Sequence, residues 1–165
     1  MITLRAASEA DHQTLVRAIQ AWWGDSRSPE AARELALLLP RLFLQHFATT
    51  SLVAETDDGA VAGFLVGLHS ADDPELAYVH FVGIEPGHRG SGLARRLYGT
   101  FFEAAAAAGR RTVKAVTSPG NHGSIAFHRK LGFRLEPGDT VVGEVPVHSD
   151  YDGPGQDRVC FVRDL

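Results

Sequence analysis

Apolar and polar residues alternate along several short segments of the chain, which is the pattern expected of strands that bury one face. The second and third of these segments are joined by Asp57-Asp58-Gly59, a sequence typical of a hairpin turn. Antiparallel neighbours are therefore expected in this part of the sheet. Strands are expected at residues 2–7, 51–56, 60–70, 76–84, 111–118, 140–147 and 157–165.

Segments with apolar residues at helical spacing lie between these strands. Ser8 can cap a first helix, which continues through the stretch LVRAIQAWW. Ser28-Pro29-Glu30 is typical of a second helix start, and Pro40 is expected to break or kink that helix. Two further helices are expected, one between Gly92 and Gly109 and one between Asn121 and Gly132.

This order of elements predicts an α+β fold with a mixed sheet, and 165 residues fit one domain spanning residues 1–165. The net charge of -4 argues against a nucleic-acid or anionic membrane partner, because no basic excess is present to neutralise phosphates. The single cysteine, Cys160, lies in an alternating segment and is expected to be a small core residue. No signal peptide or membrane span is recognisable, so a cytoplasmic protein is expected.

Three glycines, Gly87, Gly90 and Gly92, fall between an expected strand and an expected helix. Glycines at a helix start let several backbone N–H groups converge on one anion, and Arg89, Arg95 and Arg96 add positive charge nearby. The segment therefore predicts a phosphate or diphosphate site, although a solvated turn with incidental arginines is an open alternative. The Walker pattern is absent, and the dinucleotide fingerprint fits poorly.

The stretch EPGHRGSGLARRL (85–97) resembles the cofactor loop of the GNAT superfamily of acyl-CoA-dependent N-acyltransferases. A second stretch, NHGSIAFHRKLGF (121–133), resembles the second cofactor motif of the same family. The resemblance implies a central mixed sheet, mostly antiparallel, of six to seven strands with helices on both faces and splayed strands at the cofactor site. It also implies acetyl-CoA as the cofactor.

When the cofactor-binding positions of the family are matched to this sequence, the resemblance implies cofactor contacts from one strand, the glycine loop and one helix. The family has Gln or Arg where this chain has Gly87, so anion binding must depend more on backbone amides, and Arg89 could supply the lost charge. The implied cofactor-binding residues are Val82, Gly83, Ile84, Arg89, Gly90, Ser91, Gly92, Leu93, Ala94, Asn121, Ser124, Phe127 and His128.

Two histidines are the catalytic candidates that the resemblance implies. His128 occupies the position of the family's usual tyrosine, which protonates the leaving thiolate; the imidazole could donate a proton or only fill space. His80 lies where some family members carry a basic histidine, so it could accept the amine proton; a hydrogen-bonded core histidine or a surface histidine is the alternative. A glutamate base used elsewhere in the family is replaced by Val116 here.

The acceptor side is less determined by the sequence. In the family the first helices shape the acceptor pocket, so Trp22 and Trp23 are acceptor-binding candidates, with core packing expected for at least one of them. Tyr78, which shares a strand face with His80 and could relay a proton through water, is the third candidate. The aspartates of HSDYDGPGQD (148–157) could attract a cationic amine or form a solvated turn. No metal is expected, because the histidines other than His80 and His128 lack metal-ligand spacing; they are His12, His46, His69, His88, His122 and His148.

These features together predict an N-acetyltransferase that moves an acetyl group from acetyl-CoA to a primary amine of a small molecule by direct attack on the thioester. Two alternatives stay open: acetylation of a protein N-terminus or lysine, and a catalytically inactive acyl-CoA-binding module. The sequence determines neither the acceptor nor the acyl chain length, and it leaves a homodimer open.

Overall fold

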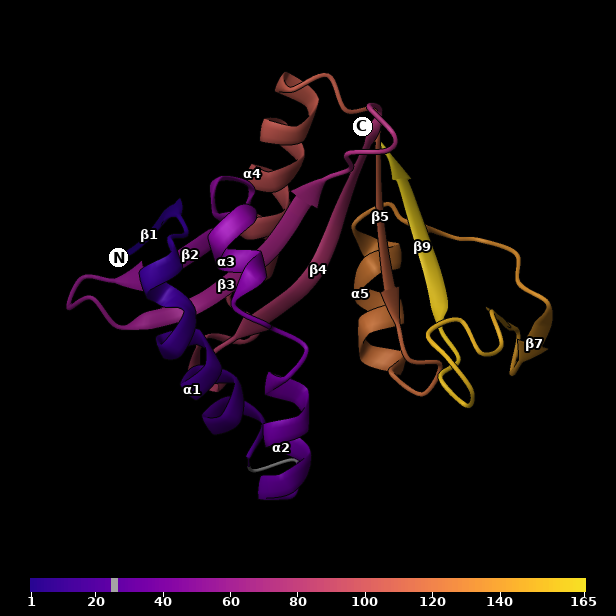
Figure 1. The fold of residues 1–165 in the computed structure, drawn as a ribbon, viewed down its shortest axis with the longest axis horizontal. Coiled ribbons are helices and arrows are strands. Elements are labelled where there is room, and N and C mark those ends of the chain that lie inside the picture. Colours follow the sequence, from indigo (N-terminus) through magenta and orange to yellow (C-terminus); the bar gives the residue numbers. More distant parts are fainter. Residues whose placement is uncertain (25–26) are drawn as a thin grey trace. The chain divides into compact units, whose positions relative to one another are not determined.

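The computed structural model describes residues 1–24 and 27–165 (Figure 1). Its main sheet has seven strands in the order β1-β2-β3-β4-β5-β9-β6, mostly antiparallel, which confirms the predicted α+β class. The helices are α1 (His12–Trp23), α2 (Pro29–Ala36), α3 (Leu42–His46), α4 (Leu93–Ala107) and α5 (His122–Lys130). The strands are β1 (Ile2–Ala6), β2 (Leu52–Thr56), β3 (Val61–His69), β4 (Leu76–Ile84), β5 (Thr112–Thr117), β6 (Arg134–Leu135), β7 (Thr140–Val142), β8 (Val145–Val147) and β9 (Val159–Asp164).

The chain divides into two compact units, which are described separately below. The first comprises residues 1–69 and 79–105, and the second comprises residues 70–78 and 106–165. Strand β4 contributes its first residues to the second unit and its remainder to the first. The expectation of a single domain over residues 1–165 stays a prediction.

The first unit is organised around the antiparallel strands β1, β2 and β3. The predicted hairpin is present: β2 and β3 are joined by a turn in which Gly59 has a φ of 83°. Phe64 of β3 is fully buried in one cluster with Leu15 and Ile19 of α1. Gly67, three residues further along β3, lies against Phe101 of α4. Since Phe64 and Gly67 point to opposite faces of a strand, α1 and α4 cover opposite faces of this sheet.

The helical part of the first unit differs from the sequence expectation in two places. The chain first forms a short 3-10 turn after Ser8, whose amide donates to the Asp11 carboxylate at 2.8 Å, and α1 begins only at His12. The second expected helix ends at Ala36 and does not reach Pro40. Residues 37–39 continue as a turn, and because a residue before proline is disfavoured in helical conformation, the helix does not resume until α3 starts at Leu42.

In the second unit, β5 pairs in parallel with β4 over Leu76–Tyr78 and antiparallel with β9. Cys160 is buried in β9, as expected of a small core residue. The single strand predicted over residues 140–147 is wrong: Gly143 and Glu144 have φ values of 54° and 71°, and this left-handed turn folds the segment into the β7–β8 hairpin. No helix in the described part of the chain is long and apolar enough to cross a membrane.

Candidate functional site

The glycine loop follows β4 directly and leads into α4. Gly90 and Gly92 have φ values of 75° and 84°, and a Cβ atom at either position would meet no heavy atom within 4 Å. These glycines are therefore required by the left-handed backbone and not by tight packing. Within the described residues, the backbone amides of Gly90, Gly92, Leu93 and Ala94 have no protein acceptor. Four unpaired donors at a helix start form a site that suits an anion.

Gly87 takes the place of the Gln or Arg side chain expected in this loop, and the carboxylate of Glu85 occupies the space beside it. A Cβ atom at Gly87 would lie 3.0 Å from Glu85 Oε2. The same oxygen accepts a hydrogen bond from His88 Nδ1 at 2.8 Å. The hydrogen bond with His88 lowers the pKa of Glu85, so this carboxylate is ionised at neutral pH.

Arg89, the residue expected to replace the missing charge, makes its contacts with β4 and α1. Its Nε donates to Ile84 O at 3.2 Å, and one terminal nitrogen lies 3.5 Å from Trp22 O. The guanidinium carbon lies 5.9 Å from the centre of the Trp23 ring. The Arg89 side chain therefore ties the end of β4 to the end of α1, and its role at a diphosphate stays a prediction.

The end of β4 carries three expected cofactor-binding residues, Val82, Gly83 and Ile84. Gly83 is required by packing, because a Cβ atom there would lie 2.5 Å from Cε1 of Phe64 and 3.1 Å from the ring of Trp23. Its expected contact with the cofactor stays a prediction. The half-buried side chains of Val82 and Ile84 belong to the same strand end.

The two tryptophans at the end of α1 have different surroundings. Trp22 is buried and stacks on Phe64 with ring centres 5.9 Å apart, which makes it the core residue that the sequence predicted. Trp23 is half-buried and meets the edge of Phe81 with ring centres 5.8 Å apart. Trp23 is therefore the better candidate for an acceptor contact.

His80 of β4 contacts two residues of a neighbouring segment: Leu38, in the turn after α2, and Phe43 of α3. Its Nε2 lies 2.5 Å from the Leu38 carbonyl oxygen, and its ring is parallel to that of Phe43, with centres 4.1 Å apart and 8° between the planes. Because a carbonyl oxygen can only accept, Nε2 carries the hydrogen. Burial lowers the pKa of His80, and the bond to Leu38 offsets only part of this shift. His80 is therefore neutral at pH 7, with an unprotonated Nδ1.

His128 belongs to the core of the second unit. Its ring stacks on Phe161 of β9 with centres 4.3 Å apart and 5° between the planes. Its Nδ1 donates to Ser124 O at 2.7 Å, and burial lowers its pKa. Asn121 caps the same helix by accepting from the Ser124 amide at 3.1 Å, and Phe127 meets the edge of His128 at 5.8 Å. Within this unit, the expected cofactor residues of α5 thus form one local cluster.

Tyr78, the third acceptor candidate, lies in the part of β4 that belongs to the second unit. Burial is the main cause that raises the pKa of its phenol, with Tyr151 and Asp152 adding to the shift. The nearby acidic loop uses its carboxylates internally: Asp150 accepts from the Gly155 amide, and Asp152 pairs with Arg158 at 2.8 Å. These bonds favour the solvated-turn interpretation of residues 148–157.

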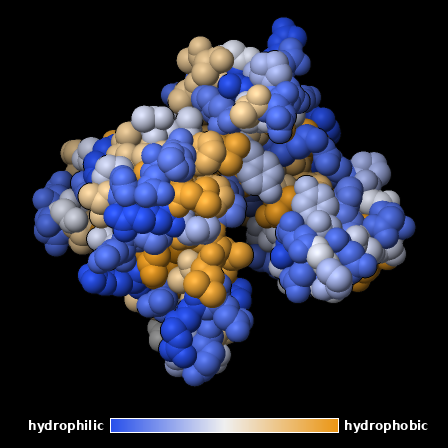
Figure 2. All heavy atoms as spheres, in the orientation of Figure 1, coloured by the Kyte–Doolittle hydropathy of each residue, from blue (hydrophilic) through white to orange (hydrophobic). Residues whose placement is uncertain are grey.

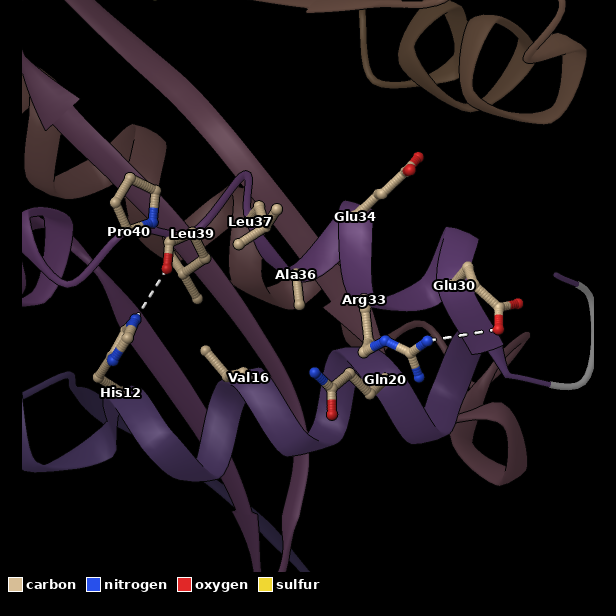
Figure 3. Close-up of a pocket in the computed structure, with 10 residues that line it drawn as sticks. All are labelled: His12, Val16, Gln20, Glu30, Arg33, Glu34, Ala36, Leu37, Leu39 and Pro40. Atoms are coloured by element: carbon tan, nitrogen blue, oxygen red, sulfur yellow. Dashed lines mark hydrogen bonds and ion pairs between the residues drawn. The ribbon is translucent and has the colours of Figure 1, made fainter. Parts of the chain in front are cut away.

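A cavity of about 610 Å³ opens between α1 and α2 in the first unit (Figure 3). His12 lies at one end of it and donates from Nε2 to Leu39 O at 2.8 Å. No motif marks this cavity in the sequence, because its residues are spread over positions 12 to 40. Val16 and Gln20 of α1 face Ala36 and Arg33 of α2 across it.

Large apolar side chains are exposed beside this cavity. Leu37, Leu38 and Leu42 are 76%, 52% and 44% exposed. Figure 2 shows apolar atoms gathered over α3 and the segment that connects it to α2. As for metals, the described residues contain no group of three or more His, Cys, Asp or Glu side chains that could hold an ion.

Comparisons with known proteins agree with the loop geometry. The model of the acetyltransferase (GNAT) family matches residues 13–133. An L-2,4-diaminobutyric acid acetyltransferase from Vibrio parahaemolyticus is 33% identical over 91 residues, which are 54% of this chain and 50% of that protein. The chain thus spans half the length of this curated relative.

A second curated relative matches over a longer stretch. The L-methionine sulfoximine/L-methionine sulfone acetyltransferase of Salmonella typhimurium is 29% identical over 154 residues, which are 88% of this chain and 84% of that protein. Among solved structures, a GNAT-family acetyltransferase from Desulfovibrio desulfuricans has a TM-score of 0.77 at 19% identity and covers 99% of both chains. The fold is therefore shared, and because the family model matches most of the sequence, the chain belongs to the acetyltransferase (GNAT) family.

Proposed function

We propose that this protein is an N-acetyltransferase that moves an acetyl group from acetyl-CoA to a primary amine of a small molecule. The observation that carries the proposal is the set of unpaired backbone amides at Gly90, Gly92, Leu93 and Ala94. These donors lie at the start of α4, where the helix dipole also favours negative charge. They fit the diphosphate of coenzyme A without any basic side chain at position 87.

The glycine loop and the end of β4 each have a role in this proposal. Bound acetyl-CoA supplies an activated thioester. The loop amides hold its diphosphate, and the backbone of residues 82–84 pairs with the pantetheine arm as an added strand would. The loop thereby orients the acyl group toward β4, which reduces the entropy lost on reaching the reactive geometry.

His80 is the proposed general base of the reaction. An amine with a pKa near 10 is mostly protonated at pH 7 and must lose that proton before it can attack a thioester. Because burial keeps the pKa of His80 below its ordinary value, its Nδ1 has a free lone pair at neutral pH. A neutral imidazole is therefore available to accept a proton from the attacking nitrogen.

His128 is better suited to packing than to proton donation. Its Nδ1–H is used by the Ser124 carbonyl, so the Nε2 of the neutral ring carries no proton to give. Donation would require the imidazolium, which burial disfavours. Since a thiolate is a fairly stable leaving group, we propose that it departs without a proton from His128.

The curated relatives support a small amine acceptor. The two described above are named for 2,4-diaminobutyric acid and for methionine sulfoximine and sulfone, all of which are amino acids or close derivatives. We therefore propose an amino-acid-like amine as the acceptor class. Protein acetylation and an inactive acyl-CoA-binding module are the alternatives that the test must separate.

Two measurements on the whole chain test this function. Isothermal titration calorimetry with coenzyme A and acetyl-CoA reads binding, and release of free thiol reads turnover. The amine panel contains 2,4-diaminobutyrate, methionine sulfone and lysine-containing peptides. We expect cofactor binding, with thiol release for the amino acids only. Release with peptides alone would support protein acetylation, binding without any release would support the inactive module, and absence of binding would overturn the proposal.

A further inference from the structure

The chain between α2 and α3 is held by two histidines from different elements. His12 of α1 donates from Nε2 to Leu39 O at 2.8 Å, and His80 of β4 donates from Nε2 to Leu38 O. Leu38 and Leu39 lie in the turn that follows α2, where their amides donate to Leu35 O and Ala36 O, so the two imidazoles hold adjacent carbonyls of this turn. The Leu38 carbonyl is therefore kept at a defined place beside the His80 ring.

Phe43 confines the same imidazole in a second direction. The two rings are nearly parallel, at 8°, with centres 4.1 Å apart. A stacked ring at this distance blocks rotation of the imidazole out of its plane, while the hydrogen bond to Leu38 selects which ring nitrogen carries the hydrogen. Phe47, one turn further along the chain, tilts against Phe43 with ring centres 6.0 Å apart. Phe47 therefore touches Phe43 but is not part of the stack on His80.

We propose that Phe43 and the Leu38 carbonyl are positioning groups for acetyl transfer, which hold His80 with its hydrogen on Nε2 and its lone pair on Nδ1. This inference rests on the proposed function, because it assigns the proton-accepting atom of the proposed base. Phe43 also packs against the hydrophobic core of the first unit, so the test must separate positioning of His80 from packing.

The proposed proton transfer balances as follows. The amine nitrogen forms a bond to the acyl carbon, the carbon–sulfur bond breaks, and the electron pair leaves with sulfur as a thiolate. The ammonium form of the amine first loses one proton to solvent. The neutral nitrogen that attacks then loses a second proton to His80 Nδ1, which makes an imidazolium that still donates from Nε2 to Leu38 O. That imidazolium then returns the proton to solvent or to the thiolate, and His80 is again neutral.

The tautomer of His80 and the mobility of its ring can be measured by NMR of protein whose histidines are labelled with nitrogen-15. We expect His80 in the wild-type chain to show a protonated Nε2 and an unprotonated Nδ1 at pH 7.5. Phe43→Leu keeps an apolar side chain but removes the ring, so the His80 signals should broaden or shift toward mixed tautomers. Phe43→Tyr keeps the stacked ring and should resemble the wild type.

Turnover and cofactor binding complete the test, with Phe47→Leu as the matched control. We expect Phe43→Leu to lower kcat about tenfold, since a partly misplaced base loses part of its catalytic effect. Its coenzyme A affinity should be unchanged, which also shows that the variant folds. Phe43→Tyr should restore kcat, and Phe47→Leu should leave both kcat and the His80 spectrum unchanged.

Three results would overturn the inference: a wild-type His80 protonated on Nδ1, an unaltered spectrum in Phe43→Leu, or equal losses in Phe43→Leu and Phe47→Leu. The proposed function fails separately. If the wild-type spectrum shows the expected tautomer but no amine releases thiol, the geometry of His80 stands and the enzymatic role does not.

Discussion

The imidazole of His128 stacks on the ring of Phe161 with 4.3 Å between the ring centres, and both side chains are buried. Position 128, where the GNAT family usually has a proton-donating tyrosine, is thus a core position of the second unit in this chain. We expect His128→Phe to keep this stack and to retain kcat within about threefold, because no proton from Nε2 is needed. His128→Ala should lower the free energy of unfolding by about 2 kcal/mol through lost packing.

Thermal unfolding and steady-state kinetics of the two His128 variants check this expectation. If His128→Phe is as stable as the wild type but loses turnover by about a hundredfold or more, the imidazole donates a proton after all.

Stability should also depend on pH through buried His128 and half-buried His80. Burial lowers the pKa values of His80 and His128 in the folded chain. At any pH between these lowered pKa values and the ordinary histidine pKa, the unfolded chain therefore binds more protons than the folded chain. Their contribution to stability is therefore complete above about pH 6.5 and is lost as the pH falls below it. We expect urea unfolding to give a lower free energy at pH 5.5 than at pH 7.5.

The variant His128→Phe isolates this effect, because it keeps the stack and removes one titrating group. The difference in stability between pH 7.5 and pH 5.5 should be smaller in this variant than in the wild type. An equal difference in both proteins would assign the pH dependence to other groups.

The glycine loop offers a test with a closely matched control. Gly92→Ala places a side chain on a left-handed residue, which costs about 1 kcal/mol and shifts the amides at the start of α4. Gly59 has nearly the same φ, 83° against 84°, and open space around it, but lies in the β2–β3 turn. We expect both variants to be destabilised similarly in thermal unfolding. Calorimetry should show weaker coenzyme A binding only in Gly92→Ala, and equal affinities would exclude the loop as the diphosphate site.

Packing predicts opposite effects for two other glycines. A Cβ atom at Gly83 would lie 2.5 Å from Cε1 of Phe64, whereas one at Gly99, inside α4, would meet nothing within 4 Å. We expect Gly83→Ala to lower the free energy of unfolding by about 1–3 kcal/mol and Gly99→Ala to raise it by about 0.5–1 kcal/mol. Urea unfolding measures both, and a Gly83→Ala variant as stable as the wild type would contradict the close packing.

Features governed by neighbouring residues were predictable from the sequence. The turn at Gly59, the cap at Asn121 and the left-handed glycines of the loop each follow from local backbone chemistry. The β7–β8 turn was missed because Glu144 has a left-handed φ that its residue type rarely adopts.

Contacts between distant residues were not predictable in this way. Phe43 and His80 are far apart in the chain, and neither has a local reason to meet the other. Likewise, the Arg89 side chain reaches a carbonyl of Trp22, although its place in the loop suggested a role toward the anion. Contacts of this kind depend on how α1, the α2–α3 connection and β4 pack together. No short sequence motif specifies that packing.

The most direct test of the proposed base compares His80→Gln with His12→Gln. A glutamine amide can still donate a hydrogen bond to the carbonyl that each histidine holds, Leu38 or Leu39, but it cannot accept a proton. We expect His80→Gln to lower kcat by about tenfold or more, chiefly below about pH 8, where the amine is mostly protonated. His12→Gln should keep the wild-type pH profile, since it alters only the hydrogen bond to the neighbouring carbonyl of Leu39. Equal losses in the two variants would mean that the histidines act by holding the α2–α3 connection, and an unchanged profile in His80→Gln would remove His80 from the mechanism.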